Sequence, residues 1–412
     1  MRPSNFAALA AICMSLCFSC APEETKVRPA SEAVKPSSEA AAITLEAAPG
    51  PENNVFARGK QPVVRLRLRN GSAQETDAPV QCAVTDFAGK EVHRSSQTVK
   101  LGPESTIEQE FPLPIERLGY YEAVFSVNGK SVRVPLTVVR EQADAKLQSG
   151  GLVGWPTAPV KGDVRSAVSE QTRAYLEGLA ARPVKPVHWE AAKAAGPISP
   201  SPEMAAQRAI AAILEGATLR RKIETGPLRA YRFFKEKTPG PTWAIWTTAP
   251  CGPVALRPLE TPVVVTDLMG NSVGLKPRQD TIIVVPCETP VFVTLSTQGI
   301  MSVYPLVSVV ESPQKVRAGE PAQVAVEVWN PLKDTMKVTA SASLPKGWTD
   351  STKEVAAKIE EGAKARLAMK FVPTADAKAG RETITISIKF DRAELPPAEL
   401  AVCMETLGRE KK

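Results

Sequence analysis

Histidine is nearly absent from this sequence, and the motifs of several common chemistries are missing. The 412 residues include two histidines, His93 and His188, too few for a multi-histidine metal centre. None of the cysteines after residue 20 lies in a CxxC motif, which argues against a zinc ribbon or a thioredoxin-type site. No Gly-x-Ser-x-Gly elbow and no glycine-rich phosphate loop occurs. We therefore expect no cofactor and no metal, and we assign no catalytic residues.

Clustered charge of one sign is also missing. Lys and Arg total 51 against 44 Asp and Glu, which gives a formal net charge of +7. Basic residues alternate with acidic ones, and no polybasic run with interleaved aromatic residues occurs. The sequence therefore favours no nucleic-acid partner.

Long apolar runs are lacking except near the N-terminus. Arg2 precedes an apolar run over residues 6–18, which has the length of a signal h-region and is too short to span a bilayer. Ser19 and Cys20 follow, and a small residue directly before a cysteine resembles the lipobox of bacterial lipoproteins. That resemblance implies a signal peptide over residues 1–19 and lipidation of Cys20. Ordinary signal-peptidase cleavage is the alternative.

The stretch from Cys20 onward is short of large apolar residues. Residues 20–42 are rich in Pro, Ser, Ala, Glu and Lys and cannot bury enough surface to fold. We expect a disordered tether between a lipid anchor and a folded body. Together with the signal, it predicts an exported protein of a bacterial cell envelope, either a membrane-anchored lipoprotein or a periplasmic or extracellular protein.

Four cysteines remain beyond the leader: Cys82, Cys251, Cys287 and Cys403. One disulfide is compatible with an exported protein. Cys251 and Cys287 fall in the same predicted domain and form the preferred pair. The alternative, to which we give equal weight, is that all four are small buried residues.

Alternating apolar residues predict an immunoglobulin-like β-sandwich over residues 43–140. Val64, Leu66 and Leu68 alternate with arginines, so one face of that strand is buried and the other is solvated. Asn128-Gly129 lies between two alternating runs, which is a strong signal for a two-residue hairpin.

Residues 141–220 change to a helical pattern, which indicates a helical linker or the remnant of a barrel. The spacing of apolar residues predicts helices over 163–181 and 203–215, with Gly216 ending the second. A further short helical piece is expected around residues 188–195.

Residues 221–297 return to a β pattern and predict a second sandwich. Expected strands lie at residues 230–235, 242–248, 261–266, 281–285 and 291–295. Trp243 and Trp246 fall on opposite faces of one strand, so we expect that strand to be buried on both faces. Residues 304–404 alternate again, as at Val324, Val326 and Val328, and predict a third, immunoglobulin-like sandwich. The fold class is therefore mainly β, with three sandwich domains and a short helical segment between the first two.

The third unit resembles the NEW3-type domain, an immunoglobulin-like module associated with carbohydrate-active enzymes. The pieces that carry the resemblance are Val316-Arg317-Ala318-Gly319, Val326-Glu327-Val328-Trp329-Asn330, Leu344-Pro345-Lys346-Gly347-Trp348 and Phe371-Val372-Pro373. They are turn residues, a tryptophan and a strand-ending proline, so the resemblance implies a fold and no catalytic role.

Residues 209–295 resemble the tail of bacterial glycoside hydrolase-like proteins, in which a barrel-closing helix runs into a β-sandwich. The matching pieces are Ile213-Leu214-Glu215-Gly216-Ala217, Ala230-Tyr231-Arg232-Phe233 and Val265-Thr266-Asp267-Leu268-Met269-Gly270-Asn271, and the first sandwich, with Leu118-Gly119-Tyr120-Tyr121, resembles the domain before the barrel. About seventy residues separate these parts, whereas a (β/α)8 barrel needs about 250. No Asn-Glu pair occurs, although the acid/base Glu of the related barrel clan follows an Asn. The resemblance therefore implies accessory sandwiches whose catalytic barrel is missing.

Two residues outside the predicted cores are candidate site residues. Asp267 is the most site-like carboxylate, but Asp and Asn in a turn with Gly usually bond local backbone N–H groups. Trp329 lies out of phase with Val324, Val326 and Val328, so it is the tryptophan to test as a ligand contact. Core packing is the expectation for Trp243 and Trp348.

The expected function is non-catalytic binding or scaffolding at the cell envelope. The expected partners are a polysaccharide or an envelope protein, with the membrane reached through the lipid anchor. The alternative is a reduced glycoside hydrolase-like enzyme acting on polysaccharide, with carboxylates drawn from Glu170, Glu177, Glu190 and Glu203. A third hypothesis is a decayed gene product that has kept no role.

Overall fold

The computed structural model describes most of the chain after the predicted tether. The described residues are 43–49, 54–140, 151–152, 164–181, 186–187, 189–190, 200–236, 240–257, 259, 261–297, 301–350, 352, 354–374, 377–393 and 395–407. They form two compact units. The N-terminal unit runs to Ala217 and also includes Thr266–Ser272, and the C-terminal unit comprises Thr218–Val265 with the residues from Val273 onward. No helix of the described residues is long and apolar enough to cross a membrane.

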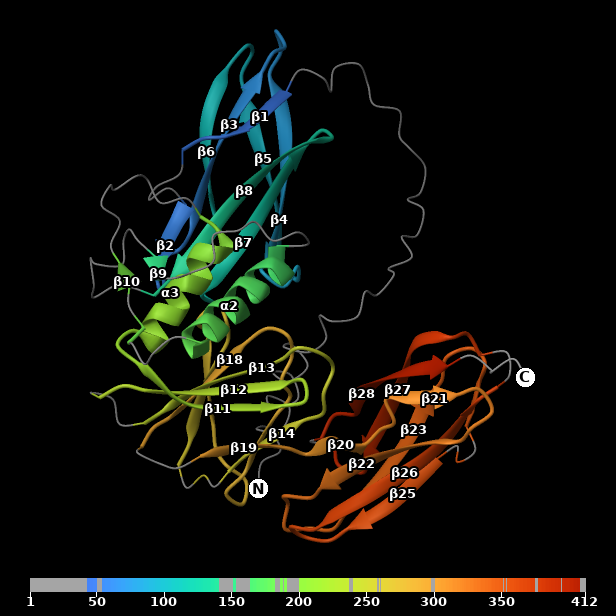
Figure 1. The fold of residues 1–412 in the computed structure, drawn as a ribbon. Coiled ribbons are helices and arrows are strands. Elements are labelled where there is room, and N and C mark those ends of the chain that lie inside the picture. Colours follow the sequence, from blue (N-terminus) through green and yellow to red (C-terminus); the bar gives the residue numbers. More distant parts are fainter. Residues whose placement is uncertain are drawn as a thin grey trace. The chain divides into compact units, whose positions relative to one another are not determined.

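The N-terminal unit contains a two-sheet sandwich (Figure 1). One sheet has the order β1-β3-β6, with bounds Ile43–Ala47, Val63–Asn70 and Thr106–Pro112. The other has the order β2-β8-β7-β4-β5, with bounds Val55–Ala57, Lys130–Val139, Gly119–Val127, Thr76–Asp86 and Glu91–Leu101. The predicted alternation is confirmed, because Val64, Leu66 and Leu68 are buried in the core between the sheets.

The predicted hairpin turn is also confirmed. Asn128 and Gly129 join β7 to β8 with φ angles of 47° and 80°, the left-handed conformation that a type I′ turn requires at both central residues.

Two helices and a two-stranded ribbon follow in the N-terminal unit. Helices α2 (Val164–Ala181) and α3 (Pro202–Leu214) pack on each other, and α3 also packs on β7 and β8 (Figure 1). Ser201 caps α3, because its hydroxyl accepts a hydrogen bond from the Met204 amide at 3.1 Å. The prediction of a helical piece around residues 188–195 is wrong for Trp189–Glu190, which form β10 and pair with β9 (Gly151–Leu152).

The described residues of the C-terminal unit form four sheets. The first has the order β11-β12-β13-β18-β15-β16, with bounds Thr218–Thr225, Leu228–Phe234, Thr242–Thr247, Val291–Leu295, Val263–Thr266 and Ser272–Leu275. A three-stranded sheet has the order β17-β14-β19, with bounds Ile282–Val284, Val254–Arg257 and Ser302–Pro305. Every residue of β13 is buried, Trp243 and Trp246 included, which confirms that this strand is covered on both faces.

The remaining two sheets form the C-terminal sandwich. One has the order β20-β22-β26-β24, with bounds Val307–Glu311, Ala322–Trp329, Lys364–Pro373 and Trp348–Asp350. Its partner has the order β21-β28-β27-β23-β25, with bounds Lys315–Arg317, Ala398–Leu407, Gly380–Phe390, Met336–Ser343 and Glu354–Ile359. Apolar residues of both sheets share one core. The predicted fold class, mainly β with sandwich domains and a short helical segment, is confirmed.

Candidate functional site

Trp329 lies at the end of β22, where its side chain is half-buried and packs against the margin of the core of the C-terminal sandwich. Val324, Val326 and Val328 are fully buried, whereas Glu327 and Trp329 are half-buried, which confirms the predicted phase. The indole N–H of Trp329 donates to the carbonyl oxygen of Gly362 at 3.2 Å. The indole N–H is therefore already hydrogen-bonded within the protein, and the part of Trp329 that a ligand could contact is the face of its ring.

Tyr304 and Arg257 surround the Trp329 ring. The centroid of the Tyr304 ring lies 5.6 Å from that of Trp329, with 66° between the planes. The guanidinium carbon of Arg257 lies 5.6 Å from the Trp329 centroid, in cation–π range. Arg257 also forms an ion pair with Asp280 at 3.1 Å. We call these four residues, Arg257, Asp280, Tyr304 and Trp329, the aromatic patch.

Tyr304 is the most accessible aromatic residue of the aromatic patch. It is 44% exposed, and two exposed valines of β20, Val309 and Val310, follow it along the chain. Sequence reasoning missed Tyr304, because it is the first residue of the predicted third sandwich and precedes the alternating runs on which that prediction rests. The available signal was the alternation of Ser302, Val303 and Tyr304, in which only Val303 is buried.

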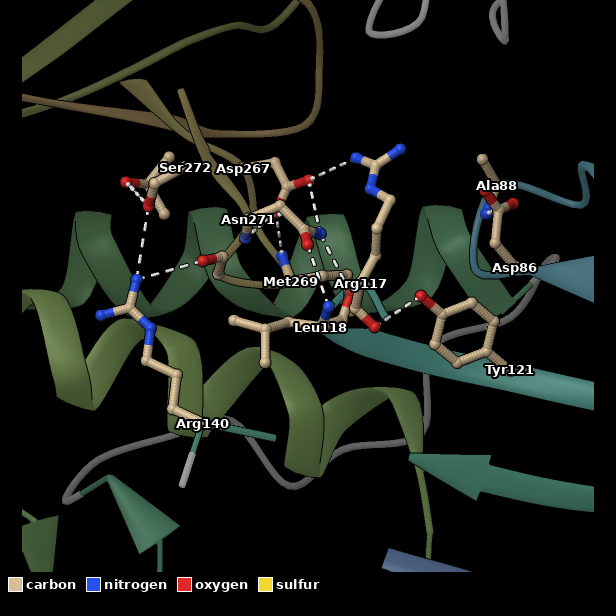
Figure 2. A network of polar contacts seen from close by, with 12 residues as sticks. Asp86, Ala88, Arg117, Leu118, Tyr121, Arg140, Asp267, Met269, Asn271 and Ser272 are labelled. Atoms are coloured by element: carbon tan, nitrogen blue, oxygen red, sulfur yellow. Dashed lines mark hydrogen bonds and ion pairs between the residues drawn. The ribbon is translucent and has the colours of Figure 1, made fainter. Parts of the chain in front are cut away.

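The turn around Asp267 is the second polar cluster, and it belongs to the N-terminal unit. Figure 2 shows the Asp267 carboxylate turned back onto its own turn. Oδ1 of Asp267 accepts from the backbone amides of Met269 at 3.0 Å and Asn271 at 2.8 Å, and Oδ2 accepts from Asn271 Nδ2 at 3.0 Å. The expected local backbone bonding is confirmed. Both oxygens of the Asp267 carboxylate accept hydrogen bonds within the turn, whereas a catalytic carboxylate needs an oxygen that faces a substrate.

Asn271 carries the turn onto the first sandwich. Its side-chain oxygen accepts from the Leu118 amide at 3.0 Å, and its side-chain nitrogen donates to the Leu118 carbonyl at 3.0 Å (Figure 2). Arg140 donates to the Gly270 carbonyl at 3.1 Å and lies 3.3 Å from the Ser272 hydroxyl. We call these residues, Leu118, Arg140, Asp267, Gly270, Asn271 and Ser272, the Asp267 clamp. The Asn271 side chain both donates to and accepts from the Leu118 backbone, so the clamp has a structural role.

Burial dominates the electrostatics of the clamp. It raises the pKa of Asp267, and the hydrogen bonds from Asn271, the Arg117 guanidinium and the Met269 amide oppose that shift. Arg117 lies 3.8 Å from Oδ2 of Asp267, and its carbonyl accepts the Tyr121 hydroxyl at 2.7 Å. Burial also raises the pKa of Tyr121 above its ordinary value.

A small recess lies beside the clamp. Its cavity volume is about 50 Å³, enough for a few waters and far below the several hundred Å³ of an ordinary small-molecule site. It is lined by Leu118, Val138, Val139, Arg140, Ala205, Arg208, Ala209, Ala212, Met269 and Gly270. Of the four glutamates considered for a hydrolase, Glu170 and Glu177 are exposed on α2 and Glu203 is half-buried at the start of α3, and none lines this recess. Nothing is described of the Glu190 side chain.

Several predicted site residues lie elsewhere. Cys20, the signal peptide and the tether lie outside the described residues. Cys251 and Cys287 are both described, and the structure holds them as thiols in neighbouring loops of the C-terminal unit. Trp348 is buried, as expected of a core residue.

Three solved structures are weakly similar to parts of this chain. The CARDB domain of a Pyrococcus furiosus protein, solved in complex with di-metal ions, is 15% identical, with 24% of this chain and 93% of that chain covered and a TM-score of 0.20. The beta-glucosidase of Listeria innocua is 14% identical, with 29% and 20% covered and a TM-score of 0.21. The alpha-2-macroglobulin of E. coli is 9% identical, with 86% and 30% covered and a TM-score of 0.23. The chain thus spans less than a third of the last two proteins, and likenesses this weak say nothing about what it binds or does.

No curated protein matches the chain. A family model does match its C-terminal sandwich, over the residues that form β21 to β27. The predicted resemblance is confirmed, and the described residues show no (β/α)8 barrel beside it. Residues 315–391 match the family model described as the NPCBM-associated NEW3 domain of alpha-galactosidase.

Proposed function

We propose that this protein is a non-catalytic binding protein of a bacterial cell envelope that attaches to polysaccharide through the aromatic patch. The observation that carries the proposal is the position of Trp329 at the end of β22, within the stretch that matches the NEW3 model, with the exposed Tyr304 against it. A module named for a glycosidase supports a carbohydrate ligand, and the aromatic patch supplies a surface of suitable chemistry.

The chemistry of the aromatic patch suits a sugar. A pyranose ring has an apolar C–H face that packs on an aromatic ring, while its hydroxyl groups both donate and accept hydrogen bonds. Arg257, which forms an ion pair with Asp280, places its further N–H donors beside the Trp329 ring. The arrangement lies on a surface and not in a closed pocket, which suits a long chain such as a polysaccharide.

Affinity electrophoresis through gels that contain a soluble polysaccharide tests the proposal. Galactomannan is the first probe, because its side chains are α-linked galactose. Tyr304→Ala and Trp329→Ala should each weaken retardation at least tenfold, which corresponds to about 1.4 kcal/mol. Val92→Ala is the matched control, because Val92 is 44% exposed and lies on the N-terminal unit. Equal retardation of all four proteins, or no binding across a glycan array, would reject a carbohydrate ligand at this surface.

The envelope location is proposed with a separate test. If Cys20 carries a lipid anchor, Cys20→Ser should move the protein from the membrane fraction to the soluble fraction. A second substitution outside the leader, such as Cys403→Ser, is the control. Fractionation of the wild-type protein entirely with soluble proteins would remove the anchor and leave the proposed sugar binding untouched.

The enzyme alternative keeps one supporting observation, the glycosidase named in the matching family model. It predicts turnover of an aryl α-galactoside that a single Glu→Gln change abolishes, with Glu170, Glu177, Glu190 and Glu203 as the positions to change. Inactivity across a panel of aryl glycosides would end this alternative.

A further inference from the structure

Cys251 and Cys287 flank the short ladder between β14 and β17 in the C-terminal unit. The antiparallel register pairs Val254 with Val284, Ala255 with Ile283 and Leu256 with Ile282. Three residues beyond Val254 is Cys251, and three residues beyond Val284 is Cys287. The ladder itself ends at Val254 and Val284, and the same register continued by three residues would set the two cysteines opposite each other. Directly opposed residues of antiparallel strands have Cα atoms about 4.5–5.5 Å apart, inside the span of about 4.4–6.8 Å that a disulfide bridges.

Thr247 provides a second observation that brings the two cysteines together. The Thr247 amide donates to the Cys287 carbonyl at 3.0 Å, and the Thr247 side chain is close enough to the Cys251 thiol to lower its pKa. As thiols, Cys251 donates to the Gly252 carbonyl at 3.4 Å and Cys287 donates to the Thr289 carbonyl at 3.5 Å. Burial raises the pKa of the Cys251 thiol, the Thr247 side chain lowers it, and the nearby Cys287 thiol raises it further. One residue at the end of β13 thus touches both cysteines.

The geometry points to Cys251 and Cys287 as a redox pair that forms a disulfide between the loop after β13 and the loop before β18. Two thiols lose two protons and two electrons as the S–S bond forms. The electrons go to an external disulfide of the glutathione type, which is reduced to two thiols. The inference does not depend on the proposed sugar binding.

The bridged loop packs directly against the C-terminal sandwich. A Cβ atom added to Gly252 would lie 3.1 Å from the Cβ atoms of Val307 and Ala398, so the loop backbone and the residues of β20 and β28 are in close contact. The carbonyl of Pro253 accepts from the Leu306 amide at 2.9 Å. Oxidation would therefore stabilise the loop at Gly252 and Pro253 that packs against β20 and β28, and reduction would remove that stabilisation.

The other two cysteines of the described residues serve as internal controls. Cys82 is buried in the core of the N-terminal unit, where burial raises the pKa of its thiol to about 11. Cys403 is exposed on β28, where Thr383 lies 3.5 Å from its sulfur. Neither lies next to the continued β14–β17 register, so neither should join the pair.

Peptide mapping of the full-length protein in oxidised and reduced glutathione buffers tests the inference without any variant. Oxidation should lower the mass by about 2 Da, and the non-reduced digest should contain one cross-linked peptide joining Cys251 to Cys287. Cys82 and Cys403 should still be alkylated under denaturing conditions. Absence of the cross-link at every glutathione ratio, or a cross-link to Cys403, would overturn the inference.

Thermal unfolding gives a second readout. The oxidised wild-type protein should melt roughly 5–10 °C above the reduced protein, because the bridge removes freedom from the unfolded chain. The Cys403→Ser variant should keep that difference, and the Cys251→Ser, Cys287→Ser double variant should lose it. An equal difference in the double variant would assign the effect to other cysteines.

Discussion

The Asp267 clamp and the aromatic patch are both clusters of polar and aromatic residues, yet they use their side chains in opposite ways. In the clamp, the side chains of Asp267 and Asn271 form hydrogen bonds with backbone atoms of the protein itself. In the aromatic patch, Tyr304 keeps almost half of its surface open to solvent. The difference teaches that a site-like carboxylate in the sequence is weak evidence for a ligand, because the fold itself can take up its hydrogen-bonding groups.

Position in the chain explains part of that difference. The clamp joins segments that lie 153 residues apart, Leu118 and Asn271, so its polar groups are needed to hold the fold. The aromatic patch is already held by β-sheet pairing of its strands, β14 with β19 and β20 with β22. Its side chains contact one another, as in the Arg257–Asp280 ion pair and the Tyr304–Trp329 ring contact, and they do not join segments as distant as those of the clamp.

Removing the side chain of Asn271 should give the largest effect on this comparison. Asn271→Ala leaves the amide and the carbonyl of Leu118 without their partner and should lower the free energy of unfolding by about 2–4 kcal/mol. Urea denaturation measures it, with Lys276→Ala as the control, because Lys276 is exposed just after β16. Polysaccharide retardation per folded molecule should stay unchanged. A stable Asn271→Ala protein with lost binding would mean that the clamp is a ligand site after all.

Trp329 should show a smaller effect that separates its two roles. Trp329→Phe keeps an aromatic ring and removes the hydrogen bond to Gly362, so the free energy of unfolding should fall by about 1 kcal/mol while polysaccharide binding persists. Tyr304→Ala should show the reverse, with lost binding and nearly unchanged stability. Urea titrations of both variants, run beside the gel assay, check this. If Tyr304→Ala destabilises more than Trp329→Phe, the aromatic patch is part of the core.

Acidity should produce the smallest effect, and it is confined to the clamp. Burial raises the pKa of Asp267 in the folded protein above its value in the unfolded chain. The protonated carboxyl therefore adds stability below the unfolded pKa, about 3.9, and this contribution is lost as the pH rises through the folded pKa. The difference in unfolding free energy between the wild type and Asp267→Asn should fall as the pH rises from 3 to 7. A difference that grows with pH would show that hydrogen bonding, and not burial, dominates at Asp267.

Local patterns predicted much of the fold, and long-range contacts account for what they missed. The alternation at Val64, Leu66 and Leu68 and the Asn128-Gly129 turn are local signals, and both are confirmed. The strand β14 was missed, because its four residues lie between prolines and offer too short a pattern to recognise. The short helical piece expected around residues 188–195 failed because the ribbon at Trp189–Glu190 depends on a partner strand far back in the chain.

The candidate site was predicted to a smaller extent. Trp329 was found through its phase relative to Val328, which is a local property. Its neighbours Arg257 and Tyr304 come from two other strands, so no spacing in the sequence connects them. The partners of Asp267 and Asn271 divide in the same way, since the bonds within the turn were expected and those to Leu118 were not.

The place of Thr266–Ser272 in the N-terminal unit also bears on how the chain is made. Ribosomes deliver a protein from its N-terminus, and domains generally fold as units during synthesis. The first sandwich and its helices are complete at Ala217, but the seven residues that occupy Leu118 emerge only after a stretch of the other unit. During synthesis, the N-terminal unit therefore lacks the hydrogen bonds between Leu118 and Asn271 until the later hairpin has been made. A shortened protein that stops at Ala217 would never form these hydrogen bonds, because it lacks Thr266–Ser272.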